Sequence, residues 1–219
     1  MTFVCGIIMV LVCFDMDNTL VRADAIHIAA FNMAFKDHRL PKVPAKELKK
    51  RFGVVAKYLV KDLFPHLSLR EAEKVVKTHD KYVVTKTAKK VKVIRGAKGA
   101  LAYLKAKGYK LCLLSNCKHK EIEATMKHAG IPLEIFTVIL GNDEVKRGKP
   151  HPDVLLKAKR LAGAKFGYMV GDTIYDIEAG KKAGFKTIAV LTGNHTRKML
   201  KAHHPDYILK SVAEIKKIL

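Results

Sequence analysis

Side chains that could carry chemistry follow the apolar runs of this sequence, where each run gives way to turn residues. Several are acidic, and carboxylates brought close together raise each other's pKa unless a cation lies among them. Oxygen ligands of this kind suit a hard ion, and a few carboxylates with a substrate phosphate suit Mg²⁺. The residues concerned are Asp15, Asp17, Thr19, Ser115, Asn116, Lys149, Asp172 and Asp176.

Together these residue types could catalyse phosphoryl transfer. The carboxylate of Asp15 could attack phosphorus and form an aspartyl-phosphate intermediate. Asp17 lies on the same side of an extended segment, so it could protonate the leaving oxygen and later deprotonate the attacking water. Ser115 and its neighbouring amides could hold the non-bridging oxygens, while Lys149 offsets their charge.

Five short apolar runs alternate with amphipathic segments, a pattern that predicts a doubly wound α/β fold around a parallel sheet buried on both faces. The carboxyl ends of parallel strands meet at one edge, so the polar groups that follow these runs should share a site. The expected strands are Val10–Phe14, Lys110–Leu114, Phe136–Leu140, Phe166–Val170 and Thr187–Leu191. The expected helices between them are Gly96–Lys107, Lys118–His128, Pro152–Leu161 and Ile174–Ala183, each followed by a glycine.

The segment between the first run and Gly96 lacks a convincing buried strand and predicts an all-helical insert instead. Its helical patterns are Ala23–Lys36, Ala45–Arg51, Val54–Leu63 and Leu69–Thr87. We therefore expect a Rossmann-like α/β core over residues 1–21 and 93–219, with a helical cap over residues 22–92. An insert that leaves the carboxyl end of a strand overhangs the ligand crevice, and its hinges should fall near Leu20–Asp24 and Val91–Gly96.

Each polar group taken alone also has a purely structural interpretation. Asp-Xaa-Asp is common in turns, and Ser115-Asn116 is typical of a helix N-cap. Lys149-Pro150 is typical of a turn before a helix, and Asp172 could itself be an N-cap. The four groups in order, each after an expected strand, favour a single functional site.

Four segments resemble the motifs of the haloacid dehalogenase superfamily of phosphatases, in particular its phosphoglycolate-phosphatase-like branch. They are "VCFDMDNTLV", "LLSN", "RGKPHPD" and "MVGDTIYDIEAGKKAG". The resemblance covers nearly the whole chain and implies Asp15 as the nucleophile and Asp17 as the general acid/base. It also implies Mg²⁺ bound by Asp15, the backbone carbonyl of Asp17 and Asp172, with Asp176 supporting the metal shell, and a cap that closes over the substrate.

The predicted site therefore divides by role. The catalytic residues are Asp15 and Asp17. The residues predicted to bind the substrate phosphate are Thr19, Ser115, Asn116 and Lys149, and those predicted to bind the metal are Asp15, Asp17, Asp172 and Asp176. The predicted function is Mg²⁺-dependent hydrolysis of a small phosphomonoester, such as phosphoglycolate or a sugar phosphate.

Individual residues distinguish the predicted phosphatase from other activities found on the same scaffold. Asp17 argues against the dehalogenase and phosphonatase branches, which lack an acid there, and no lysine follows Asp15 as in the cation-transporting ATPases. A β-phosphoglucomutase-like isomerase keeps every core residue, and His27 lies where that branch often has a histidine. A basic nucleic-acid-binding module remains a third alternative, against which the intact acids speak.

The net charge of +22 is the one unusual feature of the composition. Residues 41–110 hold 20 Lys or Arg against 5 Asp or Glu, which could attract anionic substrates or form a solvated surface. Few aromatic residues lie among the lysines, so nucleic acid is not the favoured partner.

The remaining features predict a cytoplasmic protein that is a monomer or homodimer. The cysteines Cys5, Cys13, Cys112 and Cys117 form no CxxC pair and predict buried reduced thiols. The apolar N-terminal run is too short to span a bilayer and lacks a signal-peptide pattern, and either Met1 or Met9 could be the true start.

Overall fold

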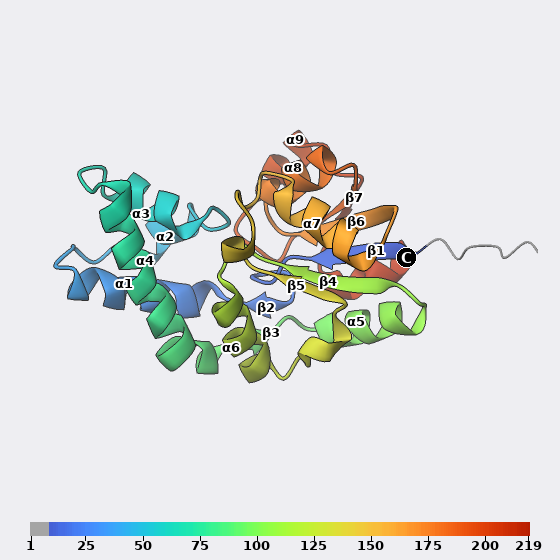
Figure 1. Ribbon diagram of the computed structural model, residues 1–219, viewed down its shortest axis with the longest axis horizontal. Coiled ribbons are helices and arrows are strands. Elements are labelled where there is room, and N and C mark those ends of the chain that lie inside the picture. Colours follow the sequence, from blue (N-terminus) through green and yellow to red (C-terminus); the bar gives the residue numbers. More distant parts are fainter. Residues whose placement is uncertain (1–8) are drawn as a thin grey trace, which may run out of the picture.

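The computed structural model describes residues 9–219, which form a parallel sheet flanked by helices and a separate group of helices (Figure 1). Cys5 and Met1 lie outside the described residues. The sheet has six strands in the order β5-β4-β1-β6-β7-β8, and every neighbouring pair is parallel. The strands are β1 (Val10–Phe14), β4 (Lys110–Leu114), β5 (Val138–Leu140), β6 (Phe166–Gly171), β7 (Lys186–Val190) and β8 (Tyr207–Leu209).

The five expected strands are present, and β8 is an addition that its three residues made hard to see in the sequence. The strand expected over Phe136–Leu140 begins later, at Val138, because the chain first makes a 3-10 turn over Leu133–Ile135. The doubly wound α/β architecture predicted from the apolar runs is confirmed.

Both faces of the sheet are buried, as continuous apolar runs require. Alternate side chains of β1 show this, because Val12 and Phe14 join one apolar cluster while Leu11 and Cys13 join another. Helices α5 (Ala97–Ala106) and α6 (His119–Ala129) cover the first face. Helices α7 (Asp153–Ala162) and α8 (Ile174–Lys182) cover the second, and α9 (Arg197–Ala202) packs beside α8.

The helical insert follows β1 and has an apolar cluster of its own. Its helices are α1 (Asp24–Asp37), α2 (Ala45–Lys49), α3 (Ala56–Leu63) and α4 (Leu69–Tyr82), and α4 continues into a π-helical turn over Val83–Thr87. In Figure 1 these helices form a group beside the carboxyl ends of the strands. The two chain segments that connect the insert to the sheet pair as short antiparallel strands, β2 (Val21–Arg22) and β3 (Lys92–Val93). This ribbon lies at the boundaries expected between cap and core.

Two smaller features bear on the sequence predictions. The described cysteines Cys13, Cys112 and Cys117 are free, with the first two buried. Among residues 9–219, no helix has both the length and the apolar character needed to cross a membrane.

Candidate active site

The strand order brings the predicted site residues to one edge of the sheet. The chain leaves β1 for β4 and β5 on one side and returns to β6 and β7 on the other. β1 is therefore the switch point beside which an open α/β sheet binds its ligands. Asp15 follows β1, Ser115 follows β4 and Asp172 follows β6.

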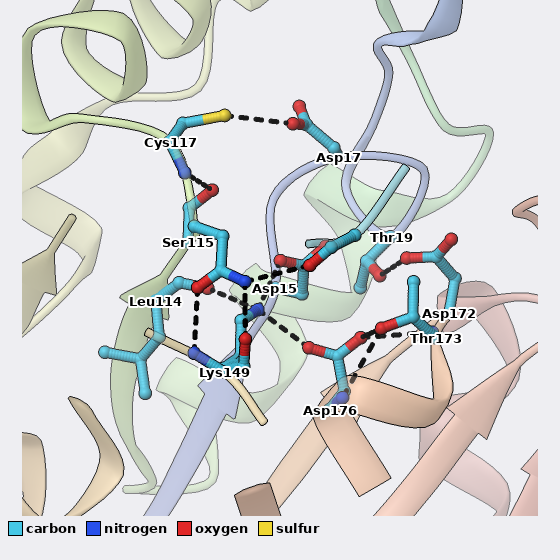
Figure 2. Close-up of polar contacts among 12 residues, drawn as sticks. Asp15, Asp17, Thr19, Leu114, Ser115, Cys117, Lys149, Asp172, Thr173 and Asp176 are labelled. Carbon is cyan, nitrogen blue, oxygen red and sulfur yellow. Dashed lines mark hydrogen bonds and ion pairs between the residues drawn. The ribbon is translucent and has the colours of Figure 1, made fainter. Parts of the chain in front are cut away.

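Lys149 lies at the centre of the cluster (Figure 2). Its buried ammonium group donates to Asp15 Oδ1 at 2.6 Å and to Asp176 Oδ1 at 2.7 Å, and also to the carbonyl oxygen of Leu114 at 3.1 Å. Burial by itself would lower the pKa of Lys149, but the two carboxylates outweigh it and hold the pKa above its ordinary value. Lys149 therefore stays charged and fixes one oxygen of Asp15.

The acids after β6 are held by the start of α8 and by a close backbone approach. Thr173 is the N-cap of α8, and the second oxygen of Asp176 accepts from the Thr173 amide and hydroxyl in a capping box. Asp172 is thus not the N-cap. Its carboxylate accepts from the Thr19 hydroxyl at 3.3 Å. A Cβ added to Gly193 would lie 1.7 Å from Asp172 Oδ2, so only glycine leaves this carboxylate room.

The carboxylates of Asp15, Asp172 and Asp176 fit a divalent cation. Each offers an oxygen within 4.8 Å of the others. Burial raises the pKa of Asp172 well above its ordinary value, and the charges of Asp15 and Asp176 add to the rise. Burial also raises the pKa of Asp15 to about 7, although Lys149 opposes the rise. The cluster thus holds more negative charge than Lys149 balances, and its hard oxygen donors are those that Mg²⁺ prefers.

Asp17 faces a second group of side chains. Its Oδ2 lies 3.1 Å from His27 Nε2 and accepts from the Cys117 thiol at 3.2 Å. Burial raises the pKa of Asp17, but the charge and hydrogen bond of His27 outweigh burial and lower the pKa overall. For His27 burial lowers the pKa, and Asp17 outweighs it and raises the pKa to about 9. Asp17 Oδ1 is buried without a partner among the described residues, so it is the oxygen left for a ligand.

Two predicted phosphate-binding residues have side chains committed elsewhere. The Asn116 amide donates to the carbonyl oxygens of Gly53 and Lys149 and accepts from the Lys149 amide. The Thr19 hydroxyl donates to Asp172. A contact of Asn116 with phosphate would therefore come from its backbone N–H. The buried Ser115 hydroxyl accepts from the Cys117 amide at 3.0 Å, which leaves its own proton free to donate.

A cavity of about 290 Å³ joins the acids to the helical insert. Asp15, Asp17 and Asp172 line its core side. Its other side carries apolar side chains together with polar and charged groups from α1, α3 and α4. The insert residues that line it include Phe31, Phe52, Val54, Leu59, Val76, Lys57, Glu73 and Lys77.

Comparisons with known proteins agree with this geometry. The model of the family described as "Haloacid dehalogenase-like hydrolase" matches residues 12–190. The chain belongs to this family. It is 33% identical over 215 residues to "Probable phosphatase IndB" of Dickeya dadantii, with 94% of this chain and 91% of the relative covered. It is also 30% identical over 206 residues to the pyrophosphatase PpaX of Halalkalibacterium halodurans, covering 93% of this chain and 94% of that one.

A solved structure has the same fold over nearly the whole of both chains. It is described as a "predicted phosphoglycolate phosphatase" from Haemophilus somnus and superposes with a TM-score of 0.80 at 24% identity, covering 96% of this chain and 97% of that chain. The prediction of a phosphatase of the haloacid dehalogenase-like family is therefore confirmed at the level of family and reaction class.

Several residues of this family member that shape the site were not anticipated. Cys117 was expected to be a buried reduced thiol; it is free but only partly buried, and it donates to Asp17. His79 lies beside His27 although 52 residues separate them. No motif surrounds His79, so the sequence gives no signal for it, whereas Cys117 directly follows the segment "LLSN". Gly193 lies in the segment "TGNHT", and its glycine is the one local hint of a close approach.

Proposed function

We propose that this protein is a Mg²⁺-dependent phosphatase that hydrolyses a small organic phosphomonoester through an aspartyl-phosphate on Asp15. The observation that carries the proposal is the position of Lys149, whose ammonium group contacts both Asp15 and Asp176 beside the further carboxylate of Asp172. The proposed nucleophile, the charge-balancing Lys149 and the proposed metal ligands all line one cavity, which is large enough for a small organic phosphate.

In the first step the Asp15 carboxylate attacks phosphorus, and the bond from phosphorus to the leaving oxygen breaks. Lys149 holds the Asp15 carboxylate in place and offsets charge on the transferring phosphoryl group. The Ser115 hydroxyl donates to a non-bridging oxygen. The departing oxygen takes a proton through Asp17, whose partner His27 holds one 3.1 Å away.

In the second step Asp17 takes a proton from the attacking water, and hydrolysis of the aspartyl-phosphate releases phosphate. Asp15, the backbone carbonyl of Asp17, and Asp172 would hold Mg²⁺, with Asp176 supporting this set. When bound, the ion supplies charge neutralisation between nucleophile and phosphate. Thr19 would act through Asp172, because its hydroxyl donates to that carboxylate.

The cap side of the cavity supports an organic leaving group. Phe31, Phe52 and Leu59 line it, and apolar side chains of this kind bind carbon-bearing groups better than a second phosphate. The relatives include proteins named pyrophosphatase, so inorganic pyrophosphate is the natural competitor. We further propose residues 22–92 as the cap and residues 1–21 and 93–219 as the core, with opening between them controlling access.

The test is a phosphate-release screen with Mg²⁺ over phosphorylated acids, sugar phosphates, aryl phosphates and pyrophosphate. Asp15→Asn is the control, since it keeps the shape of the side chain and removes the nucleophilic charge. We expect release from at least one monoester, a faster rate than with pyrophosphate, and none with the variant. If no ester releases phosphate, the proposed function is wrong.

The mutase alternative differs only in the acceptor of the phosphoryl group. Incubation with a hexose 1-phosphate distinguishes the two, because a phosphatase yields free phosphate and a mutase yields the 6-phosphate. The nucleic-acid-binding alternative predicts a salt-sensitive complex with DNA or RNA and no phosphate release from any ester.

A further inference from the structure

A chain of polar contacts runs from Asp17 along the wall of the cavity, between the insert and the sheet. His27 Nδ1 lies 3.1 Å from His79 Nε2, and His79 Nδ1 lies 3.0 Å from Asp80 Oδ1. The other oxygen of Asp80 forms an ion pair with Lys118 Nζ at 2.6 Å. His27 belongs to α1 and His79 to α4. Asp17 follows β1 and Lys118 is the N-cap residue of α6, so the chain of contacts spans both parts of the fold.

The donors and acceptors along these contacts fix the orientation of the His27 ring. The Asp80 carboxylate can only accept, so His79 Nδ1 donates to it. His79 is neutral, because burial lowers its pKa to about 4, and its Nε2 must therefore accept from His27 Nδ1. The other ring nitrogen of His27 faces Asp17, a second acceptor. The contact with His79 therefore fixes which ring nitrogen of His27 faces Asp17.

His79 also has a packing role, and the two roles can be separated. Its ring is 2% exposed and stacks on Phe31 with centroids 3.9 Å apart. Phenylalanine would keep this stacking but offers no acceptor to His27. Glutamine is neutral, and its amide oxygen reaches about as far as Nε2 of histidine, so it keeps the acceptor and loses the ring.

We propose that His79 is a positioning residue: by accepting a hydrogen bond from His27 Nδ1, it holds the His27 ring with Nε2 directed at Asp17. The inference rests on the proposed function, because it gives His79 a part in supplying the proton that the leaving oxygen takes up through Asp17. Without the acceptor, the buried Nδ1–H of His27 has no partner, and nothing at this position holds the ring with Nε2 toward Asp17.

The leaving group reveals this role. Benzyl phosphate and 4-nitrophenyl phosphate are similar in size, but benzyl alcohol is a far weaker acid and needs a proton to depart, whereas 4-nitrophenolate does not. The measurement is kcat/KM for both esters with Mg²⁺, since this constant reports the steps up to departure of the alcohol. The variants are His79→Phe and His79→Gln, with thermal unfolding as the check on folding.

General acid catalysis contributes about 10²–10⁴-fold, so we expect His79→Phe to lose about 10-fold more kcat/KM with benzyl phosphate than with 4-nitrophenyl phosphate. His79→Gln should keep the wild-type ratio between the two esters within about 3-fold, because the acceptor that supports general acid catalysis remains. His38→Phe is the matched control. His38 is the C-cap residue of α1, at the opposite end of that helix from His27, and bonds to Thr78 of α4; its replacement should not alter the ratio.

Equal losses with both esters in His79→Phe would overturn the inference and leave His79 a packing residue. A ratio in His79→Gln as altered as in His79→Phe would overturn it as well. If the wild-type protein releases phosphate from neither ester nor from any member of the wider screen, the proposed function itself fails and the inference with it. The two failures are therefore distinguishable.

Discussion

Replacing Lys149 by methionine is the most direct test of the site's electrostatics. Methionine keeps most of the side-chain volume and removes the ammonium group, which lies 2.6 Å from Asp15 and 2.7 Å from Asp176. At an effective dielectric constant of about 20, each contact is worth about 6 kcal/mol of Coulomb attraction. Desolvation of the buried ammonium offsets much of this, so the expected net loss on truncation is about 3–5 kcal/mol.

The loss should depend on pH. The carboxylates left behind can relieve their repulsion when Asp15 takes up a proton. In the wild type, Lys149 holds the pKa of Asp15 below the value that burial alone would give it. Removing the ammonium group therefore raises the pKa of Asp15 above about 7. The variant should accordingly be most destabilised above neutral pH, and least destabilised in acid, where Asp15 is already protonated in the wild type.

Urea unfolding at pH 8 and pH 5.5 measures this difference, with EDTA present so that no divalent ion takes the place of the ammonium group. Lys181→Met is the matched control, since Lys181 lies exposed on α8 and should change stability by less than about 0.5 kcal/mol. The turnover of Lys149→Met with Mg²⁺ should fall at least about 10²-fold, because charge on the phosphoryl group is no longer balanced. A stability change below about 1 kcal/mol at pH 8 would refute the assigned pairing.

Three further predictions concern neighbouring groups. Burial raises the pKa of Glu121 from 4.5 to about 8, so the unfolded chain releases a proton that the folded chain keeps, and stability falls between these pH values. The free energy of unfolding of Glu121→Gln should therefore rise relative to that of the wild type by about 1.4 kcal/mol per pH unit across that window. Urea unfolding at pH 5 and pH 7 measures this, and the same difference between variant and wild type at both pH values would contradict it. Gly193→Ala should displace Asp172 and raise the Mg²⁺ concentration for half-maximal activity about 10–100-fold, whereas Gly99→Ala, where a Cβ meets nothing, should not; equal values would contradict the assignment. Burial raises the pKa of the Cys117 thiol well above its ordinary value, so alkylation by iodoacetamide should be slow at pH 7, faster at pH 9 and accompanied by loss of activity, as mass spectrometry and phosphate release would show.

The sequence by itself determined which residue types follow which strands. Continuous apolar runs such as Val10–Phe14 can be buried only in a sheet covered on both faces, and their order with the helices between them permits few topologies. The carboxyl ends of parallel strands meet at one edge for the same geometric reason. Asp15, Ser115 and Asp172 could therefore be brought together before any contact was known.

Only the tertiary structure decided how each side chain is used. Asn116 and Thr19 have the chemistry to bind phosphate, but their polar atoms contact Lys149 and Asp172 instead. His27 and His79 meet because α1 packs on α4, a contact that depends on helix orientation and leaves no periodic mark in the chain. Asp15 thus stands out in the sequence through the strand that precedes it, whereas its charge, reach and partners are set by side chains that only folding brings near.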